Sequence, residues 1–385
     1  MERTLFDADH DAFRATVATY LDREMVPHAE RWAEAGIVDR GAVEAAGRSG
    51  LLCTAAPEEF GGGGEPDFRF NVVLNEECQR RGLNGPGMVF TLHNDVVLPY
   101  FLKFADAEQQ ARWLPGMCTG EKISAVAMTE PGAGSDLAGI QAVAVRDGDH
   151  YVVNGSKTFI TNGINADLVV TVVKTDPSAR HAGIGLLVLE RGMPGFERGR
   201  NLKKVGLHAQ DTAELSFDDV RVPVANRLGE EGAGFGYLMS CLAQERLSIA
   251  VSGVSAARAA FDWTLEHVRH REMFGTTLSA FQNTKFVLAE MATEIDVAQS
   301  FVDRCILEHV AGRLDAASAA KAKWWCTELQ KSVVDRCVQL FGGYGYMLEY
   351  PIGRAYADAR ITTIFGGATE VMKEIIARSL LSTSA

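Results

Sequence analysis

Residues 122 to 139 read Lys-Ile-Ser-Ala-Val-Ala-Met-Thr-Glu-Pro-Gly-Ala-Gly-Ser-Asp-Leu-Ala-Gly. The first seven residues predict a β-strand, and the others predict a glycine-rich turn directly after it. Gly132 and Gly134 carry no Cβ, so backbone N–H groups can approach a ligand closely, and Ser135 adds a hydroxyl. Such a turn suits an anionic cofactor, but glycine turns are common, so its meaning depends on the rest of the chain.

The sequence pattern divides the chain into three parts around this turn. Apolar residues at three- and four-residue spacing predict helices in the first part, for example over 14–32 and 68–81. Short β-branched runs separated by turn residues predict an antiparallel β domain in the second part. Long helical patterns return in the third part, over roughly 235–271, 278–311, 316–341 and 369–381. We therefore expect an α+β protein with an N-terminal helical domain (1–121), a middle antiparallel β domain (122–232) and a C-terminal four-helix bundle (233–385).

Composition excludes several classes of protein. The chain has 385 residues, of which 47% are apolar, and its 38 basic and 50 acidic residues give a formal charge of −12. This charge argues against nucleic-acid or anionic-membrane binding as the main role. The first twenty residues are rich in charge, and no apolar run approaches the ~18 residues of a membrane span, so we expect a cytoplasmic protein. Seven scattered cysteines predict neither disulfides nor a metal site.

Three further segments carry groups suited to a large cofactor. Phe159 and Thr161 alternate along a predicted strand, and an aromatic ring beside a hydroxyl suits a flat heterocycle. Arg271, at the end of a predicted helix, has a guanidinium that matches phosphate geometry. The glycine run that follows Gln339, which includes Gly343, allows close backbone approach. Each segment has an ordinary alternative as a core strand, a helix-terminal charge or a helix cap.

Glu245 is the residue with the clearest chemical meaning. On a helical wheel of about 100° per residue it lies in the apolar stripe of its helix, together with Leu242 and Ile249. A carboxylate there loses solvent, which raises its pKa toward the range useful to a general base, and Arg246 can moderate that shift. The alternative is a buried structural pair between these two side chains. The chain contains neither Gly-x-Ser-x-Gly nor a Walker-type Gly-Lys-Ser, which weighs against hydrolases and nucleoside triphosphatases.

Taken together and in this order, the segments resemble the acyl-CoA dehydrogenase family through nearly the whole chain. The resemblance implies a homotetramer with FAD at its subunit interfaces. It implies that the flavin and its ribityl chain contact Met128, Thr129, Ser135, Phe159, Ile160 and Thr161. It assigns the adenosine-diphosphate half to Arg271, Phe274, Gln282, Gln339 and Gly343, with Ala368, Thr369 and Glu370 near it. Relatives usually carry threonine where this chain has Ala368, so Thr369 is the alternative contact.

The catalytic segment departs from the commonest family pattern. Many members carry their catalytic glutamate in an Ile-Tyr-Glu-Gly segment near the C-terminus, whereas this chain reads Ile364-Phe-Gly-Gly367. The long-chain and isovaleryl members carry the base on the first bundle helix, and Gln244-Glu-Arg-Leu247 is similar to that version. The resemblance thus implies Glu245 as the base, the backbone N–H of Gly366 as a donor to the thioester oxygen and Arg246 as a supporting group. Ser135, Glu245 and Arg246 are then expected to contact the substrate.

The reaction implied by the resemblance is α,β-dehydrogenation of an acyl-CoA. Glu245 removes the α-proton, the flavin takes a hydride from the β-carbon, and the product is a trans-2-enoyl thioester, a step of fatty-acid β-oxidation. The electrons then pass to an electron-transfer flavoprotein. Two alternatives remain, an acyl-CoA oxidase that reduces oxygen and a subunit of a heteromeric dehydrogenase. Long-chain and branched-chain thioesters both remain possible as substrates.

Overall fold

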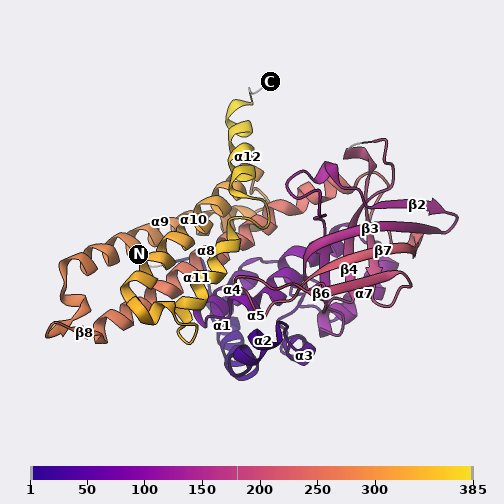
Figure 1. The fold of residues 1–385 in the computed structure, drawn as a ribbon. Helices are drawn as coiled ribbons and strands as arrows, with labels where there is room; N and C mark the ends of the chain where they lie inside the picture. Colours follow the sequence, from indigo (N-terminus) through magenta and orange to yellow (C-terminus); the bar gives the residue numbers. More distant parts are fainter. Residues whose placement is uncertain (1–2, 180, 383–385) are drawn as a thin grey trace.

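A computed structural model describes residues 3–179 and 181–382. Figure 1 shows a β-sheet at one end of the molecule and long C-terminal helices toward the other, with the N-terminal helices between and beneath them. Helices and strands from all three parts of the sequence are present, which confirms the predicted α+β class. The boundaries at 121/122 and 232/233 stay predictions.

Short helices make up the N-terminal part. They are α1 (Ala8–Tyr20), α2 (Ala29–Ala35), α3 (Arg40–Arg48), α4 (Arg69–Arg80), α5 (Asn84–Phe90), α6 (Leu98–Phe104) and α7 (Ala107–Thr119), with π-helical turns η1 (Leu21–Met25) and η4 (Thr91–Val97). The single helix predicted over 14–32 is wrong, because the chain changes to π-helical and then 3₁₀ geometry before α2. Pro27 lies in that 3₁₀ turn and has no N–H with which to continue an α-helix.

A seven-stranded sheet forms the middle part, with β5 paired only to β4. The strands are β1 (Ser124–Ala127), β2 (Val143–Asp147), β3 (His150–Thr161), β4 (Leu168–Lys174), β5 (Ile184–Glu190), β6 (Phe196–Asn201) and β7 (Thr212–Pro223), and the path is β1-β4-β2-β3-β7-β6. Most pairs are antiparallel as predicted, but β4 runs parallel to β1 and β2. The chain reaches β4 only after the β2–β3 hairpin, and it then returns beside β1 in the same direction.

The central strands fix the sheet to the N-terminal helices. Along β4, Val170 and Val172 pack into the core of those helices, whereas Val169 and Val173 pack into the core on the opposite face. Successive side chains of a strand point to opposite faces, so a strand buried on both sides is apolar throughout. The end of β1, where the glycine-rich turn begins, is thereby held next to the helical part.

Long helices make up the C-terminal part. They are α8 (Gly234–His270), α9 (Gln282–Val310), α10 (Ala316–Phe341), α11 (Pro351–Thr362) and α12 (Thr369–Leu381), with a small hairpin of β8 (Glu272–Met273) and β9 (Thr276–Thr277) between α8 and α9. The four long predicted helices agree with α8, α9, α10 and α12 within a few residues. The fourth helix packed against α8 and α10 is α11, which was not predicted, while α12 packs on α10 and projects from the bundle (Figure 1). None of the helices in the described ranges combines the length and apolar character needed to cross a bilayer.

Candidate functional site

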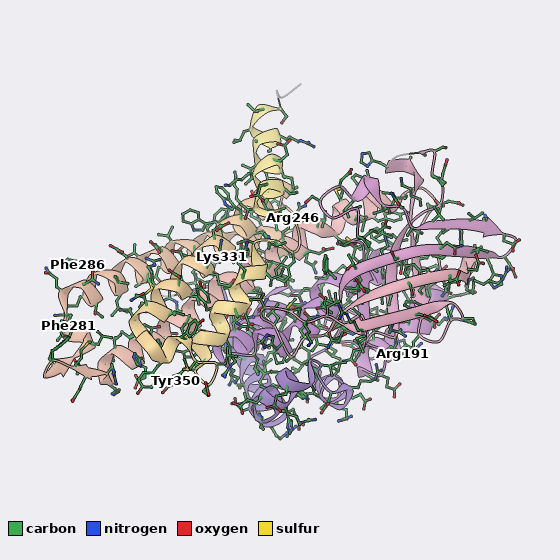
Figure 2. The ribbon with its side chains drawn as sticks, in the orientation of Figure 1. Arg191, Arg246, Phe281, Phe286, Lys331 and Tyr350 are labelled. Carbon is green, nitrogen blue, oxygen red and sulfur yellow. The ribbon has the colours of Figure 1, made fainter. Side chains whose placement is uncertain are left out.

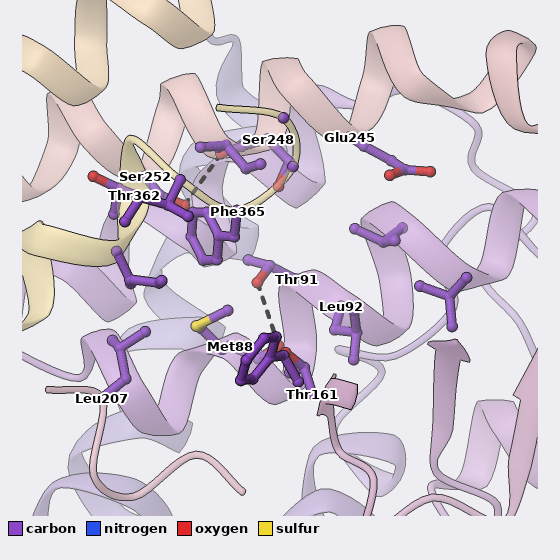
Figure 3. Close-up of a pocket in the computed structure, with 18 of the residues that line it drawn as sticks. Met88, Thr91, Leu92, Thr161, Leu207, Glu245, Ser248, Ser252, Thr362 and Phe365 are labelled. Carbon is purple, nitrogen blue, oxygen red and sulfur yellow. Dashed lines mark hydrogen bonds between the residues drawn. The ribbon is translucent and has the colours of Figure 1, made fainter. Parts of the chain in front are cut away.

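A cavity of about 640 Å³ lies where the three parts of the fold meet (Figure 3). Its walls come from α5 and η4, from the end of β1 and the end of β3, and from α8, α10, α11 and the turn before α12. It brings together a large share of the residues predicted from the sequence. These are Met128, Thr129, Ser135, Phe159, Ile160, Thr161, Glu245, Gly366 and Ala368.

A β-bulge turns Phe159 toward the cavity. The register between β3 and β7 shifts between Lys157 and Ile160, and bulges of this kind re-aim side chains beside functional sites. Phe159 has φ of 60° and is 68% exposed, an unusual state for a large aromatic residue. The flat ring is therefore available to pack against a ligand.

The glycine-rich turn is open on the side of the cavity. A Cβ built on Gly132 or on Gly134 meets no other heavy atom within 4 Å, and neither residue has a positive φ. The fold itself therefore does not require glycine at these two positions, whereas close approach of a ligand to the backbone does. With Ser135 and the ring of Phe159 on the same cavity, this wall fits a planar heterocycle that carries polar edges and a polyol chain.

A buried ion pair holds the turn in place. The Lys157 ammonium donates to Glu130 Oε1 at 2.8 Å and to the carbonyl of Met128 at 3.0 Å. The Glu130 carboxylate also accepts the backbone N–H groups of Gln141 and Ala142. Burial lowers the pKa of Lys157, and Glu130 opposes that change. Sequence reasoning missed this pair, although a lysine inside a strand with buried neighbours signals that a carboxylate partner is needed.

Glu245 is buried on α8 and lines the cavity, as the helical wheel predicted (Figure 3). Its side chain is only 6% exposed, and Tyr100 donates its hydroxyl to Glu245 Oε1 at 2.9 Å. Burial raises the pKa of Glu245 to about 7, while Tyr100, Arg246 and Lys103 act in the opposite direction. A carboxylate with a pKa near neutrality is suited to take up a proton reversibly.

Tyr100 is the main residue of the site that the sequence did not reveal. It lies on α6, 145 positions before its partner, and it is fully buried. A buried phenol needs a hydrogen-bond acceptor, but nothing local indicates which residue supplies it. The structure shows that the acceptor is Glu245.

Replacing Tyr100 by phenylalanine tests what this hydrogen bond does. The bond favours the carboxylate form, so its loss should raise the pKa of Glu245 above its present value of about 7. Because a base must be ionised to accept a proton, the rising limb of the pH profile of kcat/KM should move to higher pH by about one pH unit, the equivalent of one hydrogen bond. Tyr20→Phe is the matched control, because Tyr20 is also buried but donates to the carbonyl of Ala42. A profile that moves equally in both variants would contradict the assignment.

The turn before α12 presents Gly366 to the cavity. Gly366 has φ of 61°, and a Cβ at this position would lie 2.2 Å from Ile249 Cδ1. Within the described residues, no backbone hydrogen bond uses its N–H, which is thus free to serve as a donor. Lys323 donates to the carbonyl of Gly367 at 2.7 Å and fixes the turn, and burial lowers the pKa of Lys323 to about 8.

Gly366→Ala should disturb this turn measurably. A left-handed backbone costs an L-residue about 1–2 kcal/mol, and the end of the Ile249 side chain must also move to make room for the added methyl group. We expect a lower free energy of unfolding in urea and a lower kcat. Gly236→Ala is the control, because its Cβ meets nothing within 4 Å and its φ is not positive. Equal behaviour of the two variants would show that the turn does not depend on glycine.

A second group of predicted residues lies away from the cavity. Arg271 and Phe274 belong to the β8–β9 hairpin at the distal end of the bundle, the end at which Figure 2 shows Phe281 and Phe286. Phe274 is 89% exposed. The group consists of Arg271, Phe274, Gln282, Gln339 and Gly343, and none of these residues lines the cavity. A single chain therefore does not bring the two predicted halves of the cofactor site together.

Three more predicted residues take other positions. Thr369 is buried and donates its hydroxyl to Glu328 Oε1 at 2.9 Å, so it points to α10, and the exposed Glu370 follows it. Neither lines the cavity. Arg246 is also outside the lining, and Figure 2 shows it near the start of α12. Burial lowers its pKa and its Nε lacks a hydrogen-bond partner in the described part of the chain, so its supporting role stays a prediction.

The cysteines and His93 lie in the buried interior of the protein. All seven cysteines are free, and all are buried, which agrees with their interpretation as buried apolar residues. His93 is enclosed, with Nδ1 at 2.8 Å from the Ser124 hydroxyl, and burial lowers its pKa to about 4. Within residues 3–179 and 181–382, no three His, Cys, Asp or Glu side chains gather in a way that could hold a metal ion.

Comparison with known families accounts for this arrangement. Three sequence models match successive parts of the chain: acyl-CoA dehydrogenase, N-terminal domain, over residues 7–121; the middle domain over 125–220; and the C-terminal domain over 232–381. The chain belongs to the acyl-CoA dehydrogenase family. This result confirms the family predicted from the sequence and, with it, a flavin-dependent enzyme whose cofactor is FAD.

Individual acyl-CoA dehydrogenases are similar over their full length. The long-chain specific acyl-CoA dehydrogenase of Rattus norvegicus mitochondria is 47% identical over 384 residues, which is 99% of this chain and 89% of the rat protein. The crystal structure of an acyl-CoA dehydrogenase from Geobacillus kaustophilus has a TM-score of 0.97 and 50% identity, with 99% and 100% of the two chains covered. A glutaryl-CoA dehydrogenase from Mycobacterium smegmatis, solved in complex with FADH2, has a TM-score of 0.91 and 26% identity, covering 99% of this chain and 96% of that one. The first of these supports the long-chain branch.

Proposed function

We propose that this acyl-CoA dehydrogenase oxidises long-chain acyl-CoA thioesters with Glu245 as the catalytic base. The observation that carries the proposal is the buried Glu245 carboxylate, held by Tyr100 on the cavity that also receives Phe159 and the glycine-rich turn. Many relatives carry their catalytic glutamate at the position of Gly366. Because glycine has no side chain, Glu245 is the carboxylate of the cavity lining that is suited to remove the α-proton. Asp358 also lines the cavity, but its carboxyl group accepts the backbone N–H of Leu207. Asp358 therefore serves to hold the loop that contains Leu207.

The chain's own groups would support removal of the α-proton. The α-proton of a thioester is weakly acidic, and its removal becomes feasible when hydrogen bonds stabilise the charge that develops on the thioester oxygen. The free N–H of Gly366, fixed in its turn by Lys323, supplies one such donor. Glu245 takes the proton, and the hydroxyl of Tyr100 keeps the carboxylate in place. When bound on the wall formed by Met128, Thr129, Ser135 and 159–161, FAD supplies an acceptor for the hydride from the β-carbon.

The electron acceptor and the assembly are further parts of the proposal. Arg271, Phe274, Gln282, Gln339 and Gly343 would complete the FAD site of a neighbouring subunit in a homotetramer. None of these residues lines the cavity of its own chain, which supports this arrangement. A side chain as exposed as Phe274 can be covered only by another subunit or a ligand. We further propose an electron-transfer flavoprotein as acceptor, by the resemblance to the family, and a cytoplasmic location. Sedimentation of the holoenzyme and of Arg271→Ala tests the assembly, and the variant should lose bound flavin.

A substrate panel tests the proposed function. The purified holoenzyme is assayed with straight and branched acyl-CoAs of increasing length, with an artificial electron acceptor and with oxygen alone. We expect the highest kcat/KM for long straight chains and little peroxide. Rapid peroxide formation would instead favour an acyl-CoA oxidase, and a preference for branched chains would exclude the long-chain assignment. Activity that appears only after a second, different chain is added would indicate a heteromeric enzyme.

A further inference from the structure

The cavity continues well beyond the catalytic carboxylate. It follows α8 from Glu245 past Ser248 to Ser252, a distance of roughly 10 Å along the helix axis. Figure 3 shows Glu245 at one side of the cavity and Ser252 with Thr362 at the other. An acyl chain whose α-carbon lies at Glu245 would therefore extend toward Ser252.

Polar side chains gather at this distal end of the cavity. Ser252 is linked through Asn75 to Gln79, which also lines the cavity. The carbonyl of Cys326 on α10 packs directly against Gly253 of α8, the residue after Ser252. Gln330 lies one helical turn after Cys326 on α10. Apolar groups also line the cavity, among them Met88, Leu92, Ile249 and Phe365, and Figure 3 shows Phe365 beside Ser252 and Thr362. The distal end of the cavity therefore combines polar groups with apolar ones.

Two buried amide oxygens on the cavity lining lack partners, although the Asn84 amide group itself hydrogen-bonds the Asp358 side chain. Gln330 is 3% exposed and Asn84 is 8% exposed, and both line the cavity. Among the described residues, neither Gln330 Oε1 nor Asn84 Oδ1 has a hydrogen-bond partner. Buried amide oxygens in native proteins are nearly always hydrogen-bonded, so these two groups point to a donor that enters with a ligand.

We propose that the distal end of the cavity is a subsite for a hydroxyl group carried on the acyl chain. This inference rests on the proposed function, because it places the thioester at Glu245. A hydroxyl both donates and accepts a hydrogen bond, and a side-chain amide presents one acceptor and two donors in either orientation. A terminal carboxylate fits poorly, because it would face the two amide oxygens and the carboxyl group of Asp358. A terminal methyl group would leave both amide oxygens without a donor.

Matched pairs of substrates test the subsite. The holoenzyme is assayed with acyl-CoAs from octanoyl to palmitoyl, each with and without a hydroxyl on its last carbon. At the chain length that reaches Gln330, we expect the hydroxylated thioester to have a kcat/KM about threefold to tenfold higher than its plain partner, the equivalent of one hydrogen bond. Gln330→Met, which keeps the length of the side chain but removes the amide, should abolish this preference. Gln299→Met makes the same change on α9, outside the cavity lining, and should retain it.

Two results would overturn the proposal. One is a wild-type enzyme that favours the plain thioester at every chain length, and the other is a hydroxyl preference that survives in Gln330→Met. Calorimetry on the wild-type holoenzyme gives the dissociation constants of the same substrate pairs. These constants compare the binding of the hydroxylated and plain thioesters independently of turnover. A protein that binds the pairs with the expected difference but oxidises neither contradicts the proposed function and leaves the subsite intact.

Discussion

Glu245→Gln should lower kcat/KM for acyl-CoA by roughly 10²–10⁴-fold, the contribution typical of a positioned general base. The amide has the shape of the carboxyl group and can still accept the hydrogen bond from Tyr100, but it cannot take up the α-proton. We expect the purified variant to keep its yellow flavin, because Glu245 lies on α8 and not on the wall assigned to the cofactor. The measurement is the decrease in flavin absorbance on anaerobic mixing with acyl-CoA. Glu266→Gln, an exposed change on the same helix, should bleach at the normal rate.

The same variant should not be less stable than the wild type, which separates lost chemistry from lost folding. The pKa of Glu245 is about 7 in the folded protein against an ordinary value of 4.5, so between these pH values the folded state binds more protons than the unfolded state. The carboxylate therefore destabilises the fold as pH rises through this window, by about 3 kcal/mol at most above pH 7. Glu245→Gln should have the higher free energy of unfolding at pH 8 and lose that advantage near pH 4.5. A variant that is less stable at pH 8 would argue against a desolvated carboxylate.

Lys157→Met should cause the largest loss of stability. It leaves the carboxylate of Glu130 buried without its cation, and breaking a buried pair in this way costs about 3–5 kcal/mol. The turn from Met128 onward also loses the ammonium that holds its carbonyl, so bound flavin should fall as well. Urea unfolding of the variant and its flavin content per chain are the two measurements.

A double variant distinguishes the ion pair from simple loss of a long side chain. In Lys157→Met with Glu130→Gln, no unpaired charge remains, and a neutral amide oxygen still accepts a backbone N–H. We expect the double variant to recover much of the stability lost by Lys157→Met alone. Lys285→Met on the exposed face of α9 should change stability by less than about 0.5 kcal/mol. If the double variant were as unstable as the single one, the cost would lie in packing and not in charge.

Local sequence pattern was sufficient for the long helices and for Glu245. The helices α8, α9 and α10 repeat apolar residues over many turns, and a long repeat specifies both the element and its buried face. Glu245 stands out on that face because a carboxylate there contradicts the pattern. The β-branched runs identified the strands for the same reason. The π- and 3₁₀-helical turns near Pro27 and the 12-residue α11 were missed, because short segments carry too few repeats.

Contacts between distant residues could not be predicted in the same way. Tyr100 and Glu245 are separated by 145 positions, and no local pattern pairs a phenol with one particular carboxylate. The parallel placement of β4 beside β1 likewise depends on how the β2–β3 hairpin folds between them. The distal end of the cavity could not be predicted either, since Gln79 and Gln330 come from helices far apart in the chain. The resemblance to a known family supplied the predicted cofactor contacts, which the residues alone left open.

We propose that Glu245 removes the α-proton, and hydrogen exchange measures this step directly. An acyl-CoA whose β-carbon is replaced by sulfur cannot give up a hydride, but its α-hydrogen can still be removed and returned. In D₂O, the wild-type holoenzyme should exchange this hydrogen for deuterium during incubation, as mass spectrometry of the recovered thioester will show. Glu245→Gln should exchange it no faster than the thioester alone. Exchange at the wild-type rate in Glu245→Gln would exclude Glu245 as the base and assign that role to another residue.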